Sequence, residues 1–277
     1  MRSDTLKVPG ATLYYEVRGS GPVLLLVCGG IYDAAGYAAL ADLLADRCTV
    51  VTYDRRGNSR SPLDDPSGPQ SVDDHAADVG RLAGAVAGAE PVYVFGNSSG
   101  AVIALEFALR HPLWTAAVVA HEPPYLGLLP DDEDWPGVLR EVADAFREGG
   151  VGPAMGRFGA AMRMGDGEEG PEPDPETAAR FAGNAAVFVG DEVPVFGLHL
   201  TDFDALRAHA DRIVLAAGAR SSGQPPERAT RAAAERLGIE AAVWPGDHGG
   251  FGAHGPAFAE RLHAVFSSHP HGSSLIQ

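Results

Sequence analysis

The chain has 277 residues, which is enough for one large domain or for a core with one insertion. Its 37 acidic and 21 basic side chains give a formal charge of -16. Because an acidic chain repels nucleic acid and anionic membranes, we expect neither as a partner. No apolar run approaches the roughly 20 residues of a membrane-spanning helix, and we expect no signal peptide.

The predicted elements begin with an antiparallel hairpin, since residues 5–8 and 13–17 alternate around Pro9 and Gly10. After it, short apolar runs typical of strands buried on both faces alternate with stretches of helical spacing. The predicted strands are residues 23–27, 49–53, 92–95, 116–120, 213–217 and 240–244, and the predicted helices are residues 37–45, 71–89, 99–110, 227–237 and 257–266. This alternation predicts the α/β class, with a mostly parallel, doubly wound sheet that binds ligands at the carboxyl ends of its strands.

One long segment, residues 123–205, interrupts this alternation. It has no clear buried strand, and its helical stretches are separated by Gly/Pro-rich breaks. We therefore expect a core made of residues 1–122 and 206–267, a helical insertion over residues 123–205, and a frayed tail over residues 268–277. The helical stretches of the insertion are residues 138–146, 154–164 and 177–189.

The two cysteines are predicted to lie at opposite ends of neighbouring strands. Cys28 follows the strand at residues 23–27, and Cys48 precedes the strand at residues 49–53. About six residues at ~3.3 Å each separate the two thiols by far more than a disulfide spans. We therefore expect reduced cysteines and a cytoplasmic protein.

The chain is organised around residues 92–105, where an apolar run stops at Gly96 and a helical pattern begins at once. A strand that turns directly into a helix forces an unusual backbone angle on the residue at its tip, which is Ser98. Gly96 and Gly100 flank the tip, because a side chain at either position would collide with the neighbouring backbone. This G-x-S-x-G pattern closely resembles the nucleophile elbow of the α/β-hydrolase fold, and the resemblance covers residues 13–266.

The resemblance implies a catalytic triad in the chain order nucleophile, acid, histidine. Ser98 would be the nucleophile, activated by a base within hydrogen-bond reach, and Ser99 is a weaker rival. His248 lies in a Gly-rich loop directly after the last predicted strand, which resembles the histidine loop of the family. His254, further along the chain, is the rival base.

The acid departs from the commonest pattern of the family. Residues 218–223, where the resemblance places the usual carboxylate, contain no Asp or Glu. Glu122 ends the strand after the elbow helix, and this position resembles that of the acid in haloalkane dehalogenases and certain lactonases. Glu122 is thereby implied to orient His248 and to stabilise the imidazolium. The alternatives are a purely structural Glu122, bonded to backbone N–H groups, and Asp247 as the acid.

The resemblance also implies an oxyanion hole formed by the backbone N–H groups of Gly30 and Ser99. Cys28-Gly29-Gly30 stands where the family usually has His-Gly-x, and the turn at residues 54–59 resembles a structural turn of the family. The insertion lies where the family has a helical cap over the active site. The residues expected to contact the substrate are Cys28, Gly29, Ile31, Asn97, His121, Trp135 and Phe158.

These residues predict a serine hydrolase that cleaves a carboxylic ester, lactone or thioester of a small to medium apolar molecule through an acyl-enzyme. The serine at position 98 argues against epoxide hydrolase or dehalogenase chemistry, for which the resemblance requires a carboxylate there. Two alternatives stay open: a lyase, cyclase or carbon–carbon bond-cleaving enzyme on the same fold, and a catalytically silent ligand-binding homologue. We expect no cofactor, no metal and a small-molecule substrate as partner, and the oligomeric state stays open.

Overall fold

The computed structural model of the chain describes residues 1–68, 70–164, 167, 170 and 172–269. The predicted tail lies outside the described residues from residue 270 onward. Among the described residues, no helix combines the length and the apolar character needed to cross a membrane.

The described residues form an eight-stranded sheet in the order β1-β2-β4-β3-β5-β6-β7-β8. Strands β3 to β8 pair in parallel, whereas β1 and β2 form the predicted hairpin and β2 pairs antiparallel with β4. The strands are β1 (Arg2–Val8), β2 (Ala11–Arg18), β3 (Val23–Val27), β4 (Thr49–Tyr53), β5 (Val92–Asn97), β6 (Thr115–His121), β7 (Ile213–Gly218) and β8 (Ala242–Trp244). The sheet is therefore the mostly parallel sheet that the sequence predicts.

Helices cover both faces of the sheet, so two cores form. Helices α1 and α11 pack with Leu24 and Leu26 on one face, and α2, α3 and α9 pack with Leu25 and Val94 on the other. Successive side chains of a strand point to opposite faces, which explains why the central strands are apolar throughout. The helices are α1 (Ala38–Leu44), α2 (Val72–Ala87), α3 (Ser99–Arg110), α9 (Pro225–Leu237), α10 (Gly250–Ala253) and α11 (Gly255–Ser268), with 3₁₀ turns η1 (Ala34–Tyr37), η2 (Pro112–Trp114) and η6 (Arg207–Arg212).

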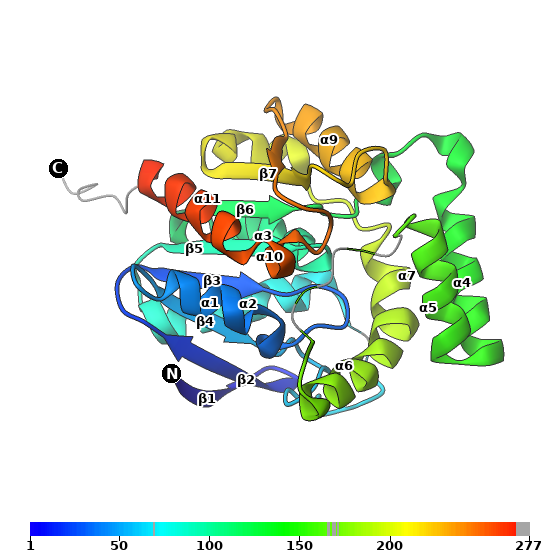
Figure 1. Cartoon of the computed structure of the whole chain (residues 1–277), viewed down its shortest axis with the longest axis horizontal. Helices are drawn as coiled ribbons and strands as arrows, with labels where there is room; N and C mark the ends of the chain where they lie inside the picture. Colours follow the sequence, from blue (N-terminus) through cyan, green and yellow to red (C-terminus); the bar gives the residue numbers. More distant parts are fainter. Residues whose placement is uncertain (69, 165–166, 168–169, 171, 270–277) are drawn as a thin grey trace.

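Residues 123–205, which we call the cap segment, contain only helices and turns in their described part. Figure 1 shows α4 to α7 gathered beyond the arrowheads of the parallel strands, at the carboxyl edge of the sheet. The elements of the cap segment are η3 (Leu126–Leu128), η4 (Asp131–Glu133), α4 (Trp135–Gly149), α5 (Val151–Ala161), α6 (Pro175–Val187), the π-helix η5 (Phe188–Glu192), α7 (Val193–Phe196) and α8 (Phe203–Leu206).

Most differences from the predicted elements occur at their ends. Helix α2 stops at Ala87 because Gly88, at φ 66°, leaves the helix while its N–H bonds to the Gly84 carbonyl. Helix α5 stops at Ala161, close to Arg163 at φ 53°. Strand β5 continues two residues past its predicted end and reaches the tip at Ser98.

Candidate active site

Ser98 stands at a strained turn between β5 and α3. Its φ of 56° and ψ of -128° lie outside the regions that a side-chain-bearing residue prefers. A Cβ atom on Gly96 would lie 2.2 Å from the Gly100 carbonyl oxygen, and one on Gly100 would lie 2.1 Å from the Val27 carbonyl oxygen. Only glycine therefore fits at either position, as the sequence predicts.

The loop that follows β3, residues 28–33, lies directly against this turn. We call it the β3 loop. A Cβ atom on Gly29 would lie 2.4 Å from the Asn97 carbonyl oxygen and 2.9 Å from Ser98 Cβ. The next residue, Gly30, has a φ of 56°, and its N–H donates to Ser99 Oγ at 3.1 Å. The sequence predicts that the Gly30 N–H binds an oxyanion, but in this structure it binds the Ser99 hydroxyl. A substrate oxygen at this position has to share or replace the bond to Ser99.

Glu122 and His248 form a short hydrogen bond. His248 Nδ1 donates to Glu122 Oε2 at 2.6 Å, and the Glu122 side chain is fully buried. Glu122 has a φ of 50°, and two bonds fix it: its N–H donates to the Ala216 carbonyl, and Gly218 N–H donates to its Oε1. Burial alone would raise the pKa of Glu122, but the hydrogen bond and charge of His248 lower it to about 2. The carboxylate is therefore ionised at neutral pH.

Asn97 and His121 are buried next to the loop that carries His248. Asn97 Nδ2 donates to the His248 carbonyl oxygen and lies 3.0 Å from His121 Nδ1. His121 is fully buried against the rings of Trp244 and Phe258, and this burial lowers its pKa to about 4. It is a neutral structural group at neutral pH.

Ser98 and His248 line the same cavity, which has a volume of about 320 Å³. Its wall comes from the β3 loop, the elbow, the cap segment and the loops after β7 and β8, and the described wall contains no Lys or Arg. The lining residues are Gly29, Gly30, Ile31, Tyr32, Asn97, Ser98, Met155, Phe158, Gly159, Met164, Gly167, Phe188, Gln224, Asp247, His248, Gly249 and Phe251. An apolar ligand of modest size suits such a wall.

Three residues expected to contact the substrate do not line this cavity. The Cys28 thiol points under the β3 loop to the Tyr32 carbonyl, His121 points into the core, and Trp135 is buried at the start of α4. We therefore do not propose them as substrate contacts. The other residues expected to contact the substrate, Gly29, Ile31, Asn97 and Phe158, all lie in the wall.

The sequence reasoning missed Tyr32, Gln224 and Phe251 in the wall. Each follows the carboxyl end of a parallel strand within a few residues, so the rule that ligands bind at strand ends could have found them. Asp247, the second candidate acid, also lies in the wall, and its Oδ1 accepts the N–H of Gly249.

The arrangement suits proton transfer at the wall of the cavity that Ser98 also lines. Because Nδ1 of His248 is bound to the ionised Glu122, the remaining ring nitrogen, Nε2, is the one available to accept a proton. An imidazolium formed there would be stabilised by the buried carboxylate. Within the described residues, no group of three or more His, Cys, Asp or Glu side chains is arranged to hold a metal ion.

The model of the alpha/beta hydrolase fold family matches residues 22–184, which is more than half of the chain. A Bacillus subtilis (strain 168) protein, YraK, named as an uncharacterized hydrolase, is 37% identical over 267 residues that cover 95% of each chain.

Solved structures also resemble the chain. One is an alpha/beta hydrolase from Sphaerobacter thermophilus, with 23% identity, a TM-score of 0.71, and coverage of 95% of this chain and 100% of the other. Another is a thermophilic esterase from Thermogutta terrifontis, with 19% identity, a TM-score of 0.73, and coverage of 98% and 100%. At these identities the two structures are evidence for the fold alone.

Proposed function

Because this chain belongs to the α/β-hydrolase fold family and is an enzyme of the hydrolase type, we propose that it is a serine hydrolase. Its substrates are carboxylic esters, lactones or thioesters of small to medium apolar molecules. The observation that carries the proposal is the 2.6 Å bond between buried Glu122 and His248, at the wall of the cavity that Ser98 lines. The same proposal includes a cytoplasmic location, since Cys28 and Cys48 are both unpaired and buried.

The proposed reaction has two halves. Ser98 Oγ attacks the carbonyl carbon while His248 Nε2 takes its proton, and the carbonyl oxygen becomes an oxyanion bound by the N–H groups of Gly30 and Ser99. His248 then gives the proton to the leaving group, which leaves an acyl group on Ser98. In the second half, His248 takes a proton from water, the hydroxide attacks the acyl carbon, and the bond to Ser98 Oγ breaks as His248 returns the proton to that oxygen. The acid is released, and Glu122 holds the imidazole throughout.

The cap segment supplies the binding surface for the substrate in this proposal. Met155, Phe158 and Phe188 come from α5 and η5 and lie in the cavity wall opposite the sheet. The rings of Phe158 and Phe188 meet edge to face, with their centres 5.1 Å apart. We propose that this apolar wall binds the acyl or alcohol part of the substrate by exclusion of water.

A fluorophosphonate reagent tests the nucleophile, because it labels only a serine that a base activates. We expect intact mass spectrometry to find one adduct on the wild-type protein, none on Ser98→Ala, and one on Ser99→Ala. Turnover of p-nitrophenyl esters and lactones is expected to disappear in Ser98→Ala and in His248→Ala. A fully active Ser98→Ala variant would refute the proposal.

Two further outcomes separate the alternatives that the sequence leaves open. Hydrolysis in ¹⁸O-labelled water places one ¹⁸O atom in the acid product, whereas a lyase or cyclase reaction with the same serine incorporates none. A wild-type protein that binds apolar ligands but gives neither an adduct nor turnover would be a catalytically silent homologue.

A further inference from the structure

The backbone of Gly30 is held by an arginine from another loop. Arg55, in the loop after β4, donates from Nη2 to the Gly30 carbonyl oxygen at 2.6 Å. A Cβ atom on Gly30 would meet nothing within 4 Å, so no neighbour packs against this residue on the side where a side chain would lie. Glycine has more rotational freedom than any other residue, and a charge-assisted hydrogen bond removes much of it. The bond to Arg55 therefore fixes one of the two peptide units that meet at the Gly30 α-carbon, and the other unit carries the Gly30 N–H.

Arg55 is in turn held by a carboxylate from the cap segment. Its Nη1 donates to Glu192 Oε1 at 2.6 Å, and both side chains are fully buried. Asn58 Nδ2 donates to the same Glu192 oxygen at 3.3 Å. Burial would lower the pKa of Arg55, but the charge of Glu192 raises it, so the guanidinium stays charged.

Stability alone does not explain such a pair. Replacing a fully buried ion pair by apolar residues of similar volume is often neutral or stabilising, because desolvation of both charges offsets their attraction. Glu192 ends the π-helix η5, and the first residue of that helix, Phe188, lies in the cavity wall. Single π-helical turns occur frequently at functional sites. The pair thus joins an element that contacts the ligand cavity to the loop that carries Gly30.

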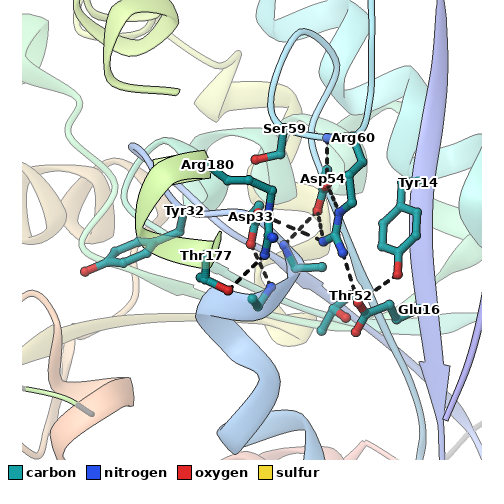
Figure 2. Close-up of polar contacts among 12 residues, drawn as sticks. Tyr14, Glu16, Tyr32, Asp33, Thr52, Asp54, Ser59, Arg60, Thr177 and Arg180 are labelled. Carbon is teal, nitrogen blue, oxygen red and sulfur yellow. Dashed lines mark hydrogen bonds and ion pairs between the residues drawn. The ribbon is translucent and has the colours of Figure 1, made fainter. Parts of the chain in front are cut away.

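Two more side chains of the cap segment bind the β3 loop. Asn184 Nδ2 donates to the Ile31 carbonyl at 2.9 Å, and Arg180 Nε donates to Asp33 Oδ2 at 2.7 Å. Figure 2 shows Arg180 reaching Asp33, while the ring of Tyr32 points away from these charges. Helix α6 therefore holds the β3 loop directly at two residues, Ile31 and Asp33, and η5 reaches a third, Gly30, only through Arg55.

We propose that Arg55 and Glu192 are positioning residues for the oxyanion hole. Through them, the placement of η5 in the cap segment sets the orientation of the Gly30 N–H, and with it the stabilisation of the transition state. The inference rests on the proposed serine hydrolase function. It adds residues that touch neither the substrate nor the reacting atoms.

The test compares kcat, KM and the affinity for a short-chain trifluoromethyl ketone, which forms a tetrahedral adduct with an activated serine. Three variants are used: Glu192→Gln, Arg55→Lys, and Arg55→Met combined with Glu192→Met. The planar guanidinium of Arg55 donates to Glu192 and to the Gly30 carbonyl at the same time, and a lysine ammonium cannot reproduce this pair of bonds. With p-nitrophenyl butyrate, we expect kcat to fall about 10- to 100-fold in Arg55→Lys and in the double variant, and about 5- to 10-fold in Glu192→Gln.

The pattern of effects distinguishes positioning from a structural role. The affinity for the ketone is expected to fall in parallel with kcat, while KM changes by less than about threefold. Arg56→Lys is the matched control, because Arg56 forms a neighbouring buried pair with Asp78 and has no described contact with the β3 loop. We expect this control to lose thermal stability and to keep kcat and the ketone affinity.

Two results would overturn the inference. One is a folded Glu192→Gln or double variant with kcat and ketone affinity both within threefold of wild type. The other is a change in KM alone. Glu192→Gln keeps the size of the side chain and an acceptor oxygen for Arg55, so it gives a folded variant if the double variant fails to fold. Failure of the proposed function itself is recognised separately, by an active Ser98→Ala in the same assay.

Discussion

Replacement of Glu122 by glutamine is the sharpest test of the proposed triad. The change keeps the shape of the side chain and removes its charge. Burial raises the pKa of Glu122, but the hydrogen bond and charge of His248 lower it from 4.5 to about 2, so these interactions favour the ionised carboxylate by about 3 kcal/mol. If the imidazolium of the transition state loses this stabilisation, kcat/KM falls about 150-fold. A glutamine N–H facing Nδ1 would also favour the wrong tautomer of His248, which adds to the loss.

The assay is kcat/KM for p-nitrophenyl butyrate between pH 6 and pH 9, together with the rate of labelling by the fluorophosphonate. Glu106→Gln is the matched control, since Glu106 is also a buried carboxylate next to a histidine, His199, but lies outside the cavity wall. We expect this control to stay within about threefold of wild type. A Glu122→Gln variant within fivefold of wild type at all pH values would refute the assignment of Glu122 and direct attention to Asp247.

The remaining predictions concern the fold around the site. Gly100→Ala places a methyl group 2.1 Å from the Val27 carbonyl oxygen, so we expect it to cost about 1–3 kcal/mol in urea denaturation and to abolish most activity. Gly156→Ala, at a helical position with no atom within 4 Å, is its control and is expected to be neutral or stabilising. The pKa of buried His121 is lowered from 6.5 to about 4, so the unfolded chain binds more protons between these pH values and stability falls as the pH is lowered through this window. Between pH 7.5 and pH 4.5, the wild-type protein is expected to lose about 2–3 kcal/mol of stability through His121, and His121→Gln is expected to remove this loss, measured by urea denaturation at both pH values. An unchanged pH dependence in His121→Gln would contradict the lowered pKa of His121. A stable, active Gly100→Ala would contradict the close packing of Gly100 against β3.

The sheet could be predicted because its signal is local. Strands β3 and β4 begin and end where the sequence predicts, since parallel strands covered on both faces need apolar side chains at every position. Helix α3 also has its predicted bounds, because the turn at Ser98 leaves no room for a connecting loop. These features depend on residues that are neighbours in the chain.

The cap segment was predictable only in outline. Its longer helices follow apolar periodicity, but the π-helix η5 has no such signal. Glu192 is buried there against Arg55, which is 137 residues away in the chain. A sequence pattern at residues 188–192 contains no information about that partner, and an isolated acidic residue is usually solvent-exposed. The cavity contacts of Tyr32 and Gln224 likewise depend on how separate loops meet.

Three residues at the carboxyl edge of the sheet share a positive φ: Gly30 after β3, Ser98 after β5 and Glu122 after β6. Such conformations cost free energy and persist only where the surroundings hold them. Ser98 and Glu122 are held by the sheet itself, since their N–H groups donate to carbonyls of β6 and β7 in continuation of the parallel ladders. The carbonyl of Gly30 is instead held by a side chain, that of Arg55. Arg55 is itself bonded to Glu192 of the cap segment, whereas the N–H groups of Ser98 and Glu122 are bonded to strands of the sheet. In the proposed site, the placement of the Gly30 donor therefore depends on contacts with the cap segment, whereas the sheet places the proposed nucleophile and acid.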